Sequence, residues 1–379
     1  MHAGGASLEG GRLAALDGLR GVAVLLVVLY HYFGGWTFVD TTLLYPYGAR
    51  FAEWPLVRDG QVGVELFFLI SGFVIFESLR RARSPAEFAA KRADRLVLPM
   101  LVLSTLSFTV LTLLPTPFFE LRPSDFLVSW SFTAPELWHW LDAEASYIDP
   151  SYWTLFVEVR FYLLMALVWF ALGRSASRAV ATIAALALAA ILGEAMLLAT
   201  GLLDVAKALD LVLFPTHLSL FAAGVLYSRL FRREAALWEV TALAALVLVG
   251  TLRLVGAPYD LGAFLNLLGW LVLFHLAFVV LALRPRWLGW LAARPLVGLG
   301  RVSYSLYLVH QGVGLALISR LPRDWPLWAQ LTGVLAVFAL MVAIAALSWH
   351  FFEQRRPFTT LLRRRRPSSI EATTEQARA

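Results

Sequence analysis

Two ionisable residues lie near the ends of an apolar stretch, LRGVAVLLVVLYHYF, that covers residues 19–33. Arg20 and His31 are eleven residues apart, which on an α-helix places them about 20° apart on one face and about 16 Å apart along the axis. Ionisable residues inside a membrane are costly to bury, and they indicate a functional site by default. A structural role is the alternative: Arg20 would reach the lipid headgroups, and His31 would bond a neighbouring helix.

A carboxylate is predicted beside His31. Glu158 lies in a second apolar segment, DPSYWTLFVEVRFYLL, at 149–164. It is about 9 Å below the end of its helix, and His31 is about five residues from the end of its own helix at Trp36, so the two depths match. A neighbouring carboxylate would raise the basicity of His31 and fix its tautomer, which general acid–base chemistry requires. The alternative for Glu158 is an ion pair with another helix or with Arg160, although Arg160 faces another side of the helix.

A basic segment, RRARSPAEFAAKRADRLVLPM at 80–100, follows the second apolar block. Its Ser84, Pro85 and Glu87 form the capping pattern that begins a helix, and this helix is predicted to continue through Pro99 into the third block. A helix that begins at this cap places the following basic side chains on neighbouring turns.

Three of those basic residues, Lys91, Arg92 and Arg95, are predicted to form an anion site with Arg20. Arg92 and Arg95 are three residues apart on one helix face, a spacing suited to holding phosphate oxygens. A phosphate-bearing compound from the cytoplasm would fit this end of the protein, whereas the predicted His31 pair could activate a hydroxyl near the opposite surface. The residues therefore predict a site that joins a cytoplasmic donor to an external acceptor.

Other polar residues inside apolar blocks allow more than one interpretation. The block VELFFLISGFVIF contains Glu65 and a Ser71–Gly72 pair, which would kink the helix or let another helix approach closely. The block RVSYSLYLVHQ stacks several polar side chains, and both structural hydrogen bonding and catalysis fit them: Ser303, Tyr304, Tyr307 and His310. The other histidines of apolar blocks are predicted to be structural: His217, His275 and His350.

The composition defines the class of protein in which these residues act. Of the 379 residues, 59% are hydrophobic and 15% are charged, whereas a soluble domain has about 25% charged residues. The expected fold is an all-α polytopic integral membrane protein with about ten transmembrane helices. The blocks that would span the membrane are 13–36, 62–80, 96–114, 152–172, 178–200, 208–230, 235–255, 260–283, 302–320 and 327–352. The tryptophan-rich segment 124–140 is expected to lie at the membrane surface.

The distribution of charge predicts the orientation. Most of the 32 Lys and Arg residues lie near the termini or in loops that would share one side with them, whereas the long loop 115–151 is acidic. By the positive-inside rule, both termini are then cytoplasmic. The transmembrane domain is expected to cover 1–356, with a basic, disordered cytoplasmic tail at 357–379. The first block is interpreted as a retained span and not as a signal peptide.

Composition also excludes several functions. The net charge of +6 is accounted for by membrane topology, so nucleic acid is not a predicted partner. The chain has no cysteine, which excludes disulfides, thiolate catalysis, thioester intermediates on the protein and zinc–thiolate sites. No metal site is predicted, and the lipid bilayer is an expected partner. The oligomeric state is left open.

Five segments together resemble the acyltransferase-3 family of bacterial membrane O-acyltransferases: LDGLRGVAVLLVVLYH (16–31), FFLISGFVI (67–75), KRADRLVLP (91–99), YWTLFVEVRFYLL (152–164) and GRVSYSLYLVH (300–310). They follow the family's order across nearly the whole membrane region. The resemblance implies a multi-pass protein of the bacterial plasma membrane. It also implies transfer of an acyl group, usually acetyl from acetyl-CoA, to a hydroxyl that most often belongs to a sugar.

The resemblance implies roles for individual residues. The positions that match the family's three motifs are Arg20 with His31, Arg92 with Arg95, and Trp153, Thr154 and Leu155 with Glu158. The expected catalytic residues are His31 and Glu158. The expected binding residues for acyl-CoA and acceptor are Arg20, Lys91, Arg92, Arg95, Ser71, Trp153, Tyr304 and His310. The chain is expected to be a form without the family's additional hydrolase-like domain, which leaves open whether a partner protein completes the transfer.

The resulting hypothesis places the phosphates of acyl-CoA on the arginines and extends its pantetheine arm along the first span to His31. His31 would deprotonate the acceptor hydroxyl or first accept the acyl group itself. Acceptors that fit are a surface polysaccharide, a lipid-linked sugar, peptidoglycan or a glycosylated small molecule. One rival is a transporter or flippase for an anionic or lipid-linked compound, against which the sequence shows no repeated halves and no matching broken helices. The other rival, a structural scaffold, predicts that Arg20 and His31 can be replaced without effect.

Overall fold

The protein is all-helical wherever the structure is described. The computed structural model describes residues 3–34, 44–116, 120–141, 143–255 and 261–364, and every regular element in these ranges is a helix. This confirms the predicted fold class. Nine helical segments in the described ranges are long and apolar enough to cross a membrane, and they correspond to nine of the ten predicted blocks.

The elements follow one another without a strand in the described part of the chain. The first half consists of α1 (Ala3–Phe33), α3 (Pro55–Arg58), η1 (Gly60–Val62), α4 (Gly63–Arg81), α5 (Pro85–Leu113), α6 (Asp125–Ser131), α7 (Pro135–His139), η2 (Pro150–Tyr152), α8 (Trp153–Ala171) and α9 (Ala176–Ala199). The second half consists of α10 (Leu203–Leu213), α11 (Pro215–Phe231), α12 (Leu237–Val255), α13 (Leu261–Leu283), η3 (Pro285–Ala292), α14 (Arg294–Val309), α15 (Gly312–Ile318), α16 (Leu327–Ser348), η4 (Trp349–Glu353) and α17 (Pro357–Arg364).

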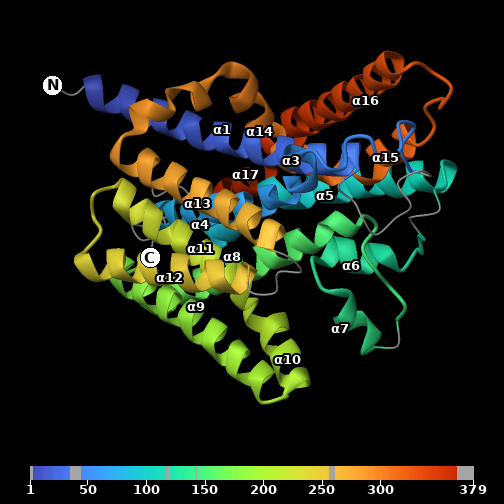
Figure 1. The fold of residues 1–379 in the computed structure, drawn as a ribbon. Helices are drawn as coiled ribbons and strands as arrows, with labels where there is room; N and C mark the ends of the chain where they lie inside the picture. Colours follow the sequence, from blue (N-terminus) through green and yellow to red (C-terminus); the bar gives the residue numbers. More distant parts are fainter. Residues whose placement is uncertain (1–2, 35–43, 117–119, 142, 256–260, 365–379) are drawn as a thin grey trace, which may run out of the picture.

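The long helices run side by side as a bundle (Figure 1). The start of α1 lies at one end of the bundle, and α6 and α7 lie toward the opposite end. We call these the N-terminal end and the distal end. Helix α1 packs against α14 and α4, and α4 packs in turn against α11. These four helices form the centre of the bundle, and three of them, α1, α4 and α14, contribute to the site described below together with α5 and α8.

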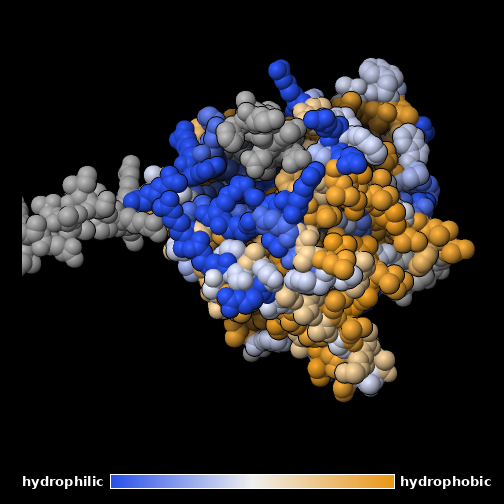
Figure 2. All heavy atoms as spheres, turned by 90° about the vertical axis from the view of Figure 1, so that its left-hand side faces the viewer, coloured by the Kyte–Doolittle hydropathy of each residue, from blue (hydrophilic) through white to orange (hydrophobic). Residues whose placement is uncertain are grey.

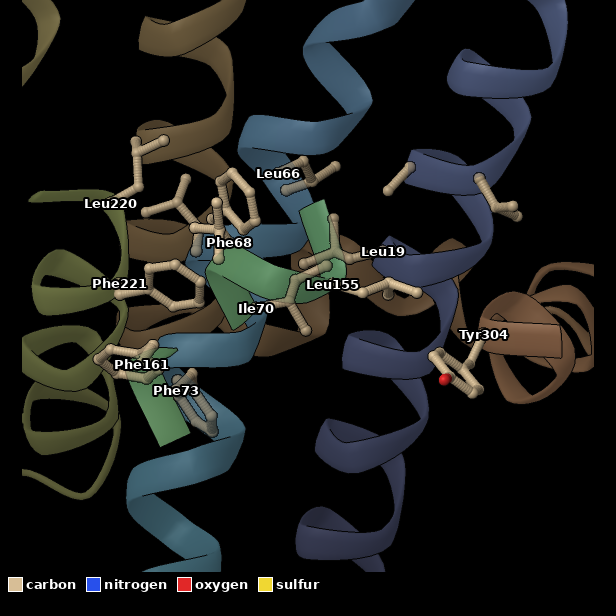
Figure 3. Close-up of a cluster of buried hydrophobic side chains, with 14 of the residues drawn as sticks. Leu19, Leu66, Phe68, Ile70, Phe73, Leu155, Phe161, Leu220, Phe221 and Tyr304 are labelled. Atoms are coloured by element: carbon tan, nitrogen blue, oxygen red, sulfur yellow. The ribbon is translucent and has the colours of Figure 1, made fainter. Parts of the chain in front are cut away.

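Glycine allows α4 and α11 to touch through their backbones. A Cβ atom on Gly72 would lie 2.0 Å from the carbonyl oxygen of Phe221, and one on Gly224 would lie 2.2 Å from that of Leu69. The predicted close approach at Gly72 is therefore confirmed. Around this crossing, aromatic side chains from three helices fill the core: Phe68 and Phe73 from α4, Phe161 from α8 and Phe221 from α11 (Figure 3).

The predicted helix start at 84 is confirmed in detail. The hydroxyl of Ser84 accepts a hydrogen bond from the backbone N–H of Glu87 at 3.2 Å. In return, the carboxylate of Glu87 accepts one from the backbone N–H of Arg83 at 3.0 Å. Pro85 occupies the first helical position, and α5 continues through Pro99 as one helix. The cap fixes where the basic residues of α5 enter the bundle.

The remaining predicted span, 302–320, is not one continuous helix. It is divided into α14 and α15, with His310 and Gln311 at the junction. In an unbroken helix the N–H of Gly312 would bond to the carbonyl of Leu308. Here the carboxylate of Asp149 accepts that N–H at 2.6 Å. Hydropathy alone does not detect such an exchange of backbone partners.

Asp149 is held in place at this break by a second set of bonds. Its carboxylate also accepts from the backbone N–H and the hydroxyl of Ser151 at 2.9 and 2.7 Å. The carbonyl of Leu308, which does not bond to Gly312 here, accepts a hydrogen bond from the hydroxyl of Tyr152 at 2.7 Å. Burial raises the pKa of Asp149 to about 6. The turn that begins α8 therefore stabilises the interruption between α14 and α15.

The predicted span 208–230 is also interrupted. It begins earlier, at Leu203, and breaks at Phe214, whose φ of 38° lies in the left-handed region. Pro215 then begins α11, because proline has no N–H to bond the preceding turn. The tryptophan-rich segment 124–140 forms only the short helices α6 and α7, so it does not span the bundle, as predicted.

The tail does not begin as a disordered segment, contrary to the prediction for 357–379. Residues 357–364 form α17, which packs against α5. The carboxylate of Asp94 accepts hydrogen bonds from the backbone N–H groups of Phe358 and Thr359 at 2.7 and 3.2 Å. These bonds give acceptors to backbone N–H groups in the first turn of α17, which have none within the helix, and they attach α17 to the bundle. The rest of the predicted tail, 365–379, lies outside the described residues.

The N-terminal end of the bundle is its charged end. Figure 2 looks onto this end, where hydrophilic residues gather over much of the face and hydrophobic residues cover the adjoining flank. Ion pairs here connect neighbouring helices: Arg80 of α4 pairs with Glu234 at 2.6 Å, and Arg229 of α11 pairs with Glu239 of α12 at 3.1 Å. The apolar flank suits the lipid interior, and the charged face suits water and headgroups.

Candidate active site

The imidazole of His31 contacts the imidazole of His310. His310 Nε2 lies 3.2 Å from His31 Nδ1, and the two ring centroids are 5.0 Å apart. His31 comes from α1, and His310 stands at the break between α14 and α15. The interruption of the helix therefore has a direct consequence, because it fixes His310 against His31.

Hydrogen bonds to carbonyl oxygens define the tautomers of both rings. His31 Nδ1 lies 3.0 Å from the carbonyl oxygen of Val27, and His310 Nδ1 lies 2.8 Å from that of Tyr307. Because a carbonyl can only accept, Nδ1 carries the proton in each ring. His310 Nε2 then accepts from His31 Nδ1–H, and the lone pair of His31 is on Nε2. A neutral imidazole with a defined lone pair is suited to act as a base.

Glu158 is not the partner of His31, contrary to the prediction. Among the described residues, its carboxylate accepts hydrogen bonds from the hydroxyls of Ser71, at 2.6 Å, and Tyr162. Its charge acts on Arg20, Arg92 and Arg95. Glu158 therefore belongs to the arginine group of the site and not to the histidine pair.

The predicted pairing of His31 with Glu158 assumed equal depths of the two residues below their helix ends. The end of the first span was predicted at Trp36, which lies outside the described residues, whereas α1 ends at Phe33. His31 is then about 3 Å from the end of its helix, but Glu158 is about 7.5 Å beyond Trp153, where α8 begins. The carboxylate therefore lies deeper in the bundle than the histidine.

The predicted arginine group is formed, but Lys91 is not part of it. Arg20 and Arg95 line one narrow cavity of about 50 Å³ together with Glu158. Arg92 lies beside them on α5, donates to Ser78 at 3.2 Å and faces the ring of Tyr162, which is 5.6 Å away. Lys91 instead pairs with Glu87 at 2.8 Å on the surface of α5, outside this cavity. We call Arg20, Arg92 and Arg95 the arginine cluster.

Two other predicted residues line the arginine cavity. Ser71 donates to Glu158, and Tyr304 donates its hydroxyl to the carbonyl of Leu96 at 3.0 Å. In Figure 3, Tyr304 projects from α14 toward α1. Glu353 of the π-helix η4 adds a further charge that acts on Arg20 and Arg95. Sequence reasoning missed Glu353, because it stands at the far end of an uninterrupted apolar block.

A second cavity, of about 240 Å³, contains His31. Val64 and Tyr307 line both this cavity and the arginine cavity. The hydroxyl of Tyr307 bonds to Thr154 at 3.0 Å, so its ring is fixed between the two spaces. The two cavities are therefore neighbours that share Val64 and Tyr307 as walls, with Arg20 and Arg95 on one side and His31 on the other.

The cavity of His31 contains polar groups that the sequence analysis did not assign to the site. Glu65 and Gln311 both line it. Glu65 Oε2 and Gln311 Oε1 are buried and have no hydrogen-bond partner among the described residues. Glu65 is thus the carboxylate that shares a cavity with His31, the position that had been predicted for Glu158. Its place in the first turn of α4, beside α1, was the sequence signal for this.

A third and larger cavity, of about 1000 Å³, is lined by residues of all six helices from α7 to α12. Its aromatic lining includes Trp140, which is 72% exposed, and Tyr147. Trp153 lines both this cavity and that of His31. Its indole packs against His217, with ring centroids 5.3 Å apart. Trp153 therefore separates a wide vestibule from the space around His31.

The fold and the site together define a class of protein: a polytopic helical membrane protein in which a half-buried His31 contacts the buried His310, beside a half-buried arginine cluster. The sequence also matches the family model described as "Acyltransferase domain" over residues 13–350. The chain therefore belongs to the acyltransferase-3 family, as the motifs had indicated, and an acyltransferase activity is supported. Comparisons with curated proteins and with solved structures find no match.

Proposed function

We propose that the protein transfers an acyl group, acetyl in the simplest case, from cytoplasmic acyl-CoA to a hydroxyl of a carbohydrate or glycosylated acceptor. One observation carries this proposal: the cavity of Arg20 and Arg95 adjoins the cavity of His31, with Tyr307 and Val64 in the walls of both. The guanidinium groups would bind the phosphates of the donor by charge-assisted hydrogen bonds. An unbranched pantetheine arm that passes Tyr307 and Val64 would bring the thioester from the first cavity to His31.

The proposed orientation places the N-terminal end in the cytoplasm of a bacterium and the distal end outside its plasma membrane. The arginine-rich loops at the N-terminal end support it through the positive-inside rule. The donor would then enter from the side where CoA is made, and the acceptor would enter through the vestibule. The protein would thus transfer the acyl group across the membrane without transporting either substrate.

The chemistry at His31 follows from its tautomer. The hydroxyl oxygen of the acceptor attacks the thioester carbon, the carbon–sulfur bond breaks, and the hydroxyl proton passes to His31 Nε2 and then to the CoA thiolate. The same lone pair could attack the thioester first, and an acyl-imidazole would then pass its acyl group to the acceptor. In both routes His310 and the carbonyl of Val27 hold the proton of His31 on Nδ1. Glu158 would position the arginine cluster.

The lining of the vestibule supports a carbohydrate acceptor. Aromatic rings such as Trp140 and Tyr147 offer apolar faces, which pack against the C–H faces of sugar rings. Carboxylates such as Glu136 and Asp204 can accept hydrogen bonds from sugar hydroxyls. A volume of about 1000 Å³ admits a ligand of more than one ring.

The test is acetyl transfer by the purified protein in lipid nanodiscs with radiolabelled acetyl-CoA. Surface glycans and metabolites of a deletion strain and a complemented strain are compared by mass spectrometry to find the acceptor. We expect a mass difference of one acyl group, and loss of transfer in His31→Ala with normal expression. Near-normal transfer by a well-expressed His31→Ala protein would refute the assignment.

A transporter remains the second candidate, because the structure does contain interrupted helices. The breaks at Phe214 and His310 remove one argument made against it from the sequence. The same assay separates the two functions: a transporter moves its substrate without acceptor-dependent release of CoA.

A further inference from the structure

The carboxylate of Glu65 is not fully hydrogen-bonded within the described part of the fold. Its Oε2 atom is buried and lacks a hydrogen-bond partner in the described part of the chain. Other buried carboxylates of the protein are satisfied: Glu77 bonds to Ser228 and Arg232, and Glu194 bonds to Arg253. A buried carboxylate oxygen without a donor is costly. The unpartnered oxygen of Glu65 indicates that its hydrogen-bond donor arrives with a ligand.

The surroundings of Glu65 identify where that donor would be. Glu65 lines the cavity of about 240 Å³ that also contains His31. Gln311 Oε1 is a second buried acceptor without a partner at the same cavity. The cavity thus combines a base with two oxygen atoms that require hydrogen-bond donors. A ligand with a single hydroxyl has one proton to donate. That proton would go to His31, and both oxygen atoms would still lack a donor.

We infer that Glu65, together with Gln311, binds a second hydroxyl of the acceptor, adjacent to the hydroxyl that His31 activates, so that the protein selects vicinal diols over simple alcohols. This rests on the proposed function and narrows its acceptor to a class. Sugars and other polyols carry such pairs of hydroxyls, whereas a fatty alcohol carries a single hydroxyl. Glu65 is then a specificity-determining residue, which contacts the acceptor but not the transferred acyl group.

The inference can be tested with two small acceptors of the same ring. The probes are trans-1,2-cyclohexanediol and cyclohexanol, each offered with radiolabelled acetyl-CoA to the protein in nanodiscs. Because a hydrogen bond to a charged group is worth about 1.5–3 kcal/mol, we expect kcat/KM for the diol to exceed that for cyclohexanol by roughly 10- to 100-fold. Glu65→Leu, which removes the acceptor oxygens, should bring the two values close together by lowering transfer to the diol.

Two further variants make the test specific. Glu65→Gln keeps one acceptor oxygen without the charge and should retain an intermediate preference. Glu53→Gln makes the same change at an exposed site and should behave like the unmodified protein. The elution profile in size-exclusion chromatography and the thermal unfolding midpoint of each variant show whether it is folded, and the comparison rests on the ratio of the two kcat/KM values within each variant.

The outcomes separate this inference from the proposed function. An active protein whose preference for the diol is absent, or is unchanged in Glu65→Leu, overturns the role of Glu65 and leaves the acyltransferase proposal intact. A protein that transfers acetyl to no hydroxyl, water included, overturns both.

Discussion

Replacement of His310 distinguishes a positioning role from a catalytic one. The Nδ1–H of His31 has two acceptors, His310 Nε2 at 3.2 Å and the carbonyl of Val27 at 3.0 Å. His310→Leu removes only the first, so the tautomer of His31 is kept by the second. Loss of one neutral hydrogen bond is worth about 0.5–1.5 kcal/mol, which corresponds to a decrease in kcat/KM of roughly 2- to 12-fold. The decrease should therefore be far smaller than that caused by His31→Ala.

The assay is acetyl transfer under saturating and limiting acceptor, with His310→Gln as the rescuing variant. The amide oxygen of Gln can accept the same N–H, so this variant should recover part of the lost activity. His275→Leu serves as the matched control, because His275 is buried against Tyr227 and lines none of the three cavities. A loss in His310→Leu as complete as that in His31→Ala would refute the reasoning and make His310 part of the chemistry.

Three further predictions concern the donor site, the helix crossing and the helix break. Arg95→Ala should raise KM for acetyl-CoA by roughly 10- to 100-fold, because it removes a charge-assisted contact, whereas Lys91→Ala, outside the cavity, should leave KM unchanged in steady-state assays. Gly72→Ala should lower stability by about 1–3 kcal/mol in thermal unfolding, because its Cβ would overlap a carbonyl of α11; Gly269→Ala, with open space around it, is the control. Asp149 has a pKa raised from 3.8 to about 6, so the folded protein binds its proton more tightly than the unfolded chain does. It contributes stability that is full below pH 4 and is lost as the pH rises to 6, by roughly 3 kcal/mol, and Asp149→Asn should abolish this slope in unfolding measured against pH.

Each of these has a contradicting result. Equal KM values for the Arg95 and Lys91 variants would remove the arginine cluster from the donor site. Equal melting temperatures for the two glycine variants would show that α4 and α11 can separate at no cost. The same dependence of stability on pH in the wild type and in Asp149→Asn would assign that dependence to other groups.

Local sequence signals predicted the parts of the fold that depend on local physics. Ser84 and Glu87 identified the start of α5, because a cap needs only residues within one turn. Gly72 indicated a close helix crossing, since only glycine permits backbone contact at that distance. The spacing of Arg92 and Arg95 similarly predicted that both would join one cluster.

The parts that were missed depend on contacts between distant segments. The break at His310 requires Asp149, which is far away in sequence and replaces a backbone acceptor. The sequence predicted Glu158 beside His31, and the structure places Glu65 there instead. The difference depends on how far each helix extends, and hydropathy does not determine helix ends to within one turn. Lys91 is next to Arg92 in sequence but about 100° away around the helix, and its ammonium group pairs with Glu87.

The ring of Tyr307 lies in the wall of both cavities, and its hydroxyl bonds to Thr154 at 3.0 Å. A change of this one side chain therefore reshapes the space beside the arginine cluster and the space beside His31 together. No substitution at position 307 can enlarge one of these spaces and leave the other as it was.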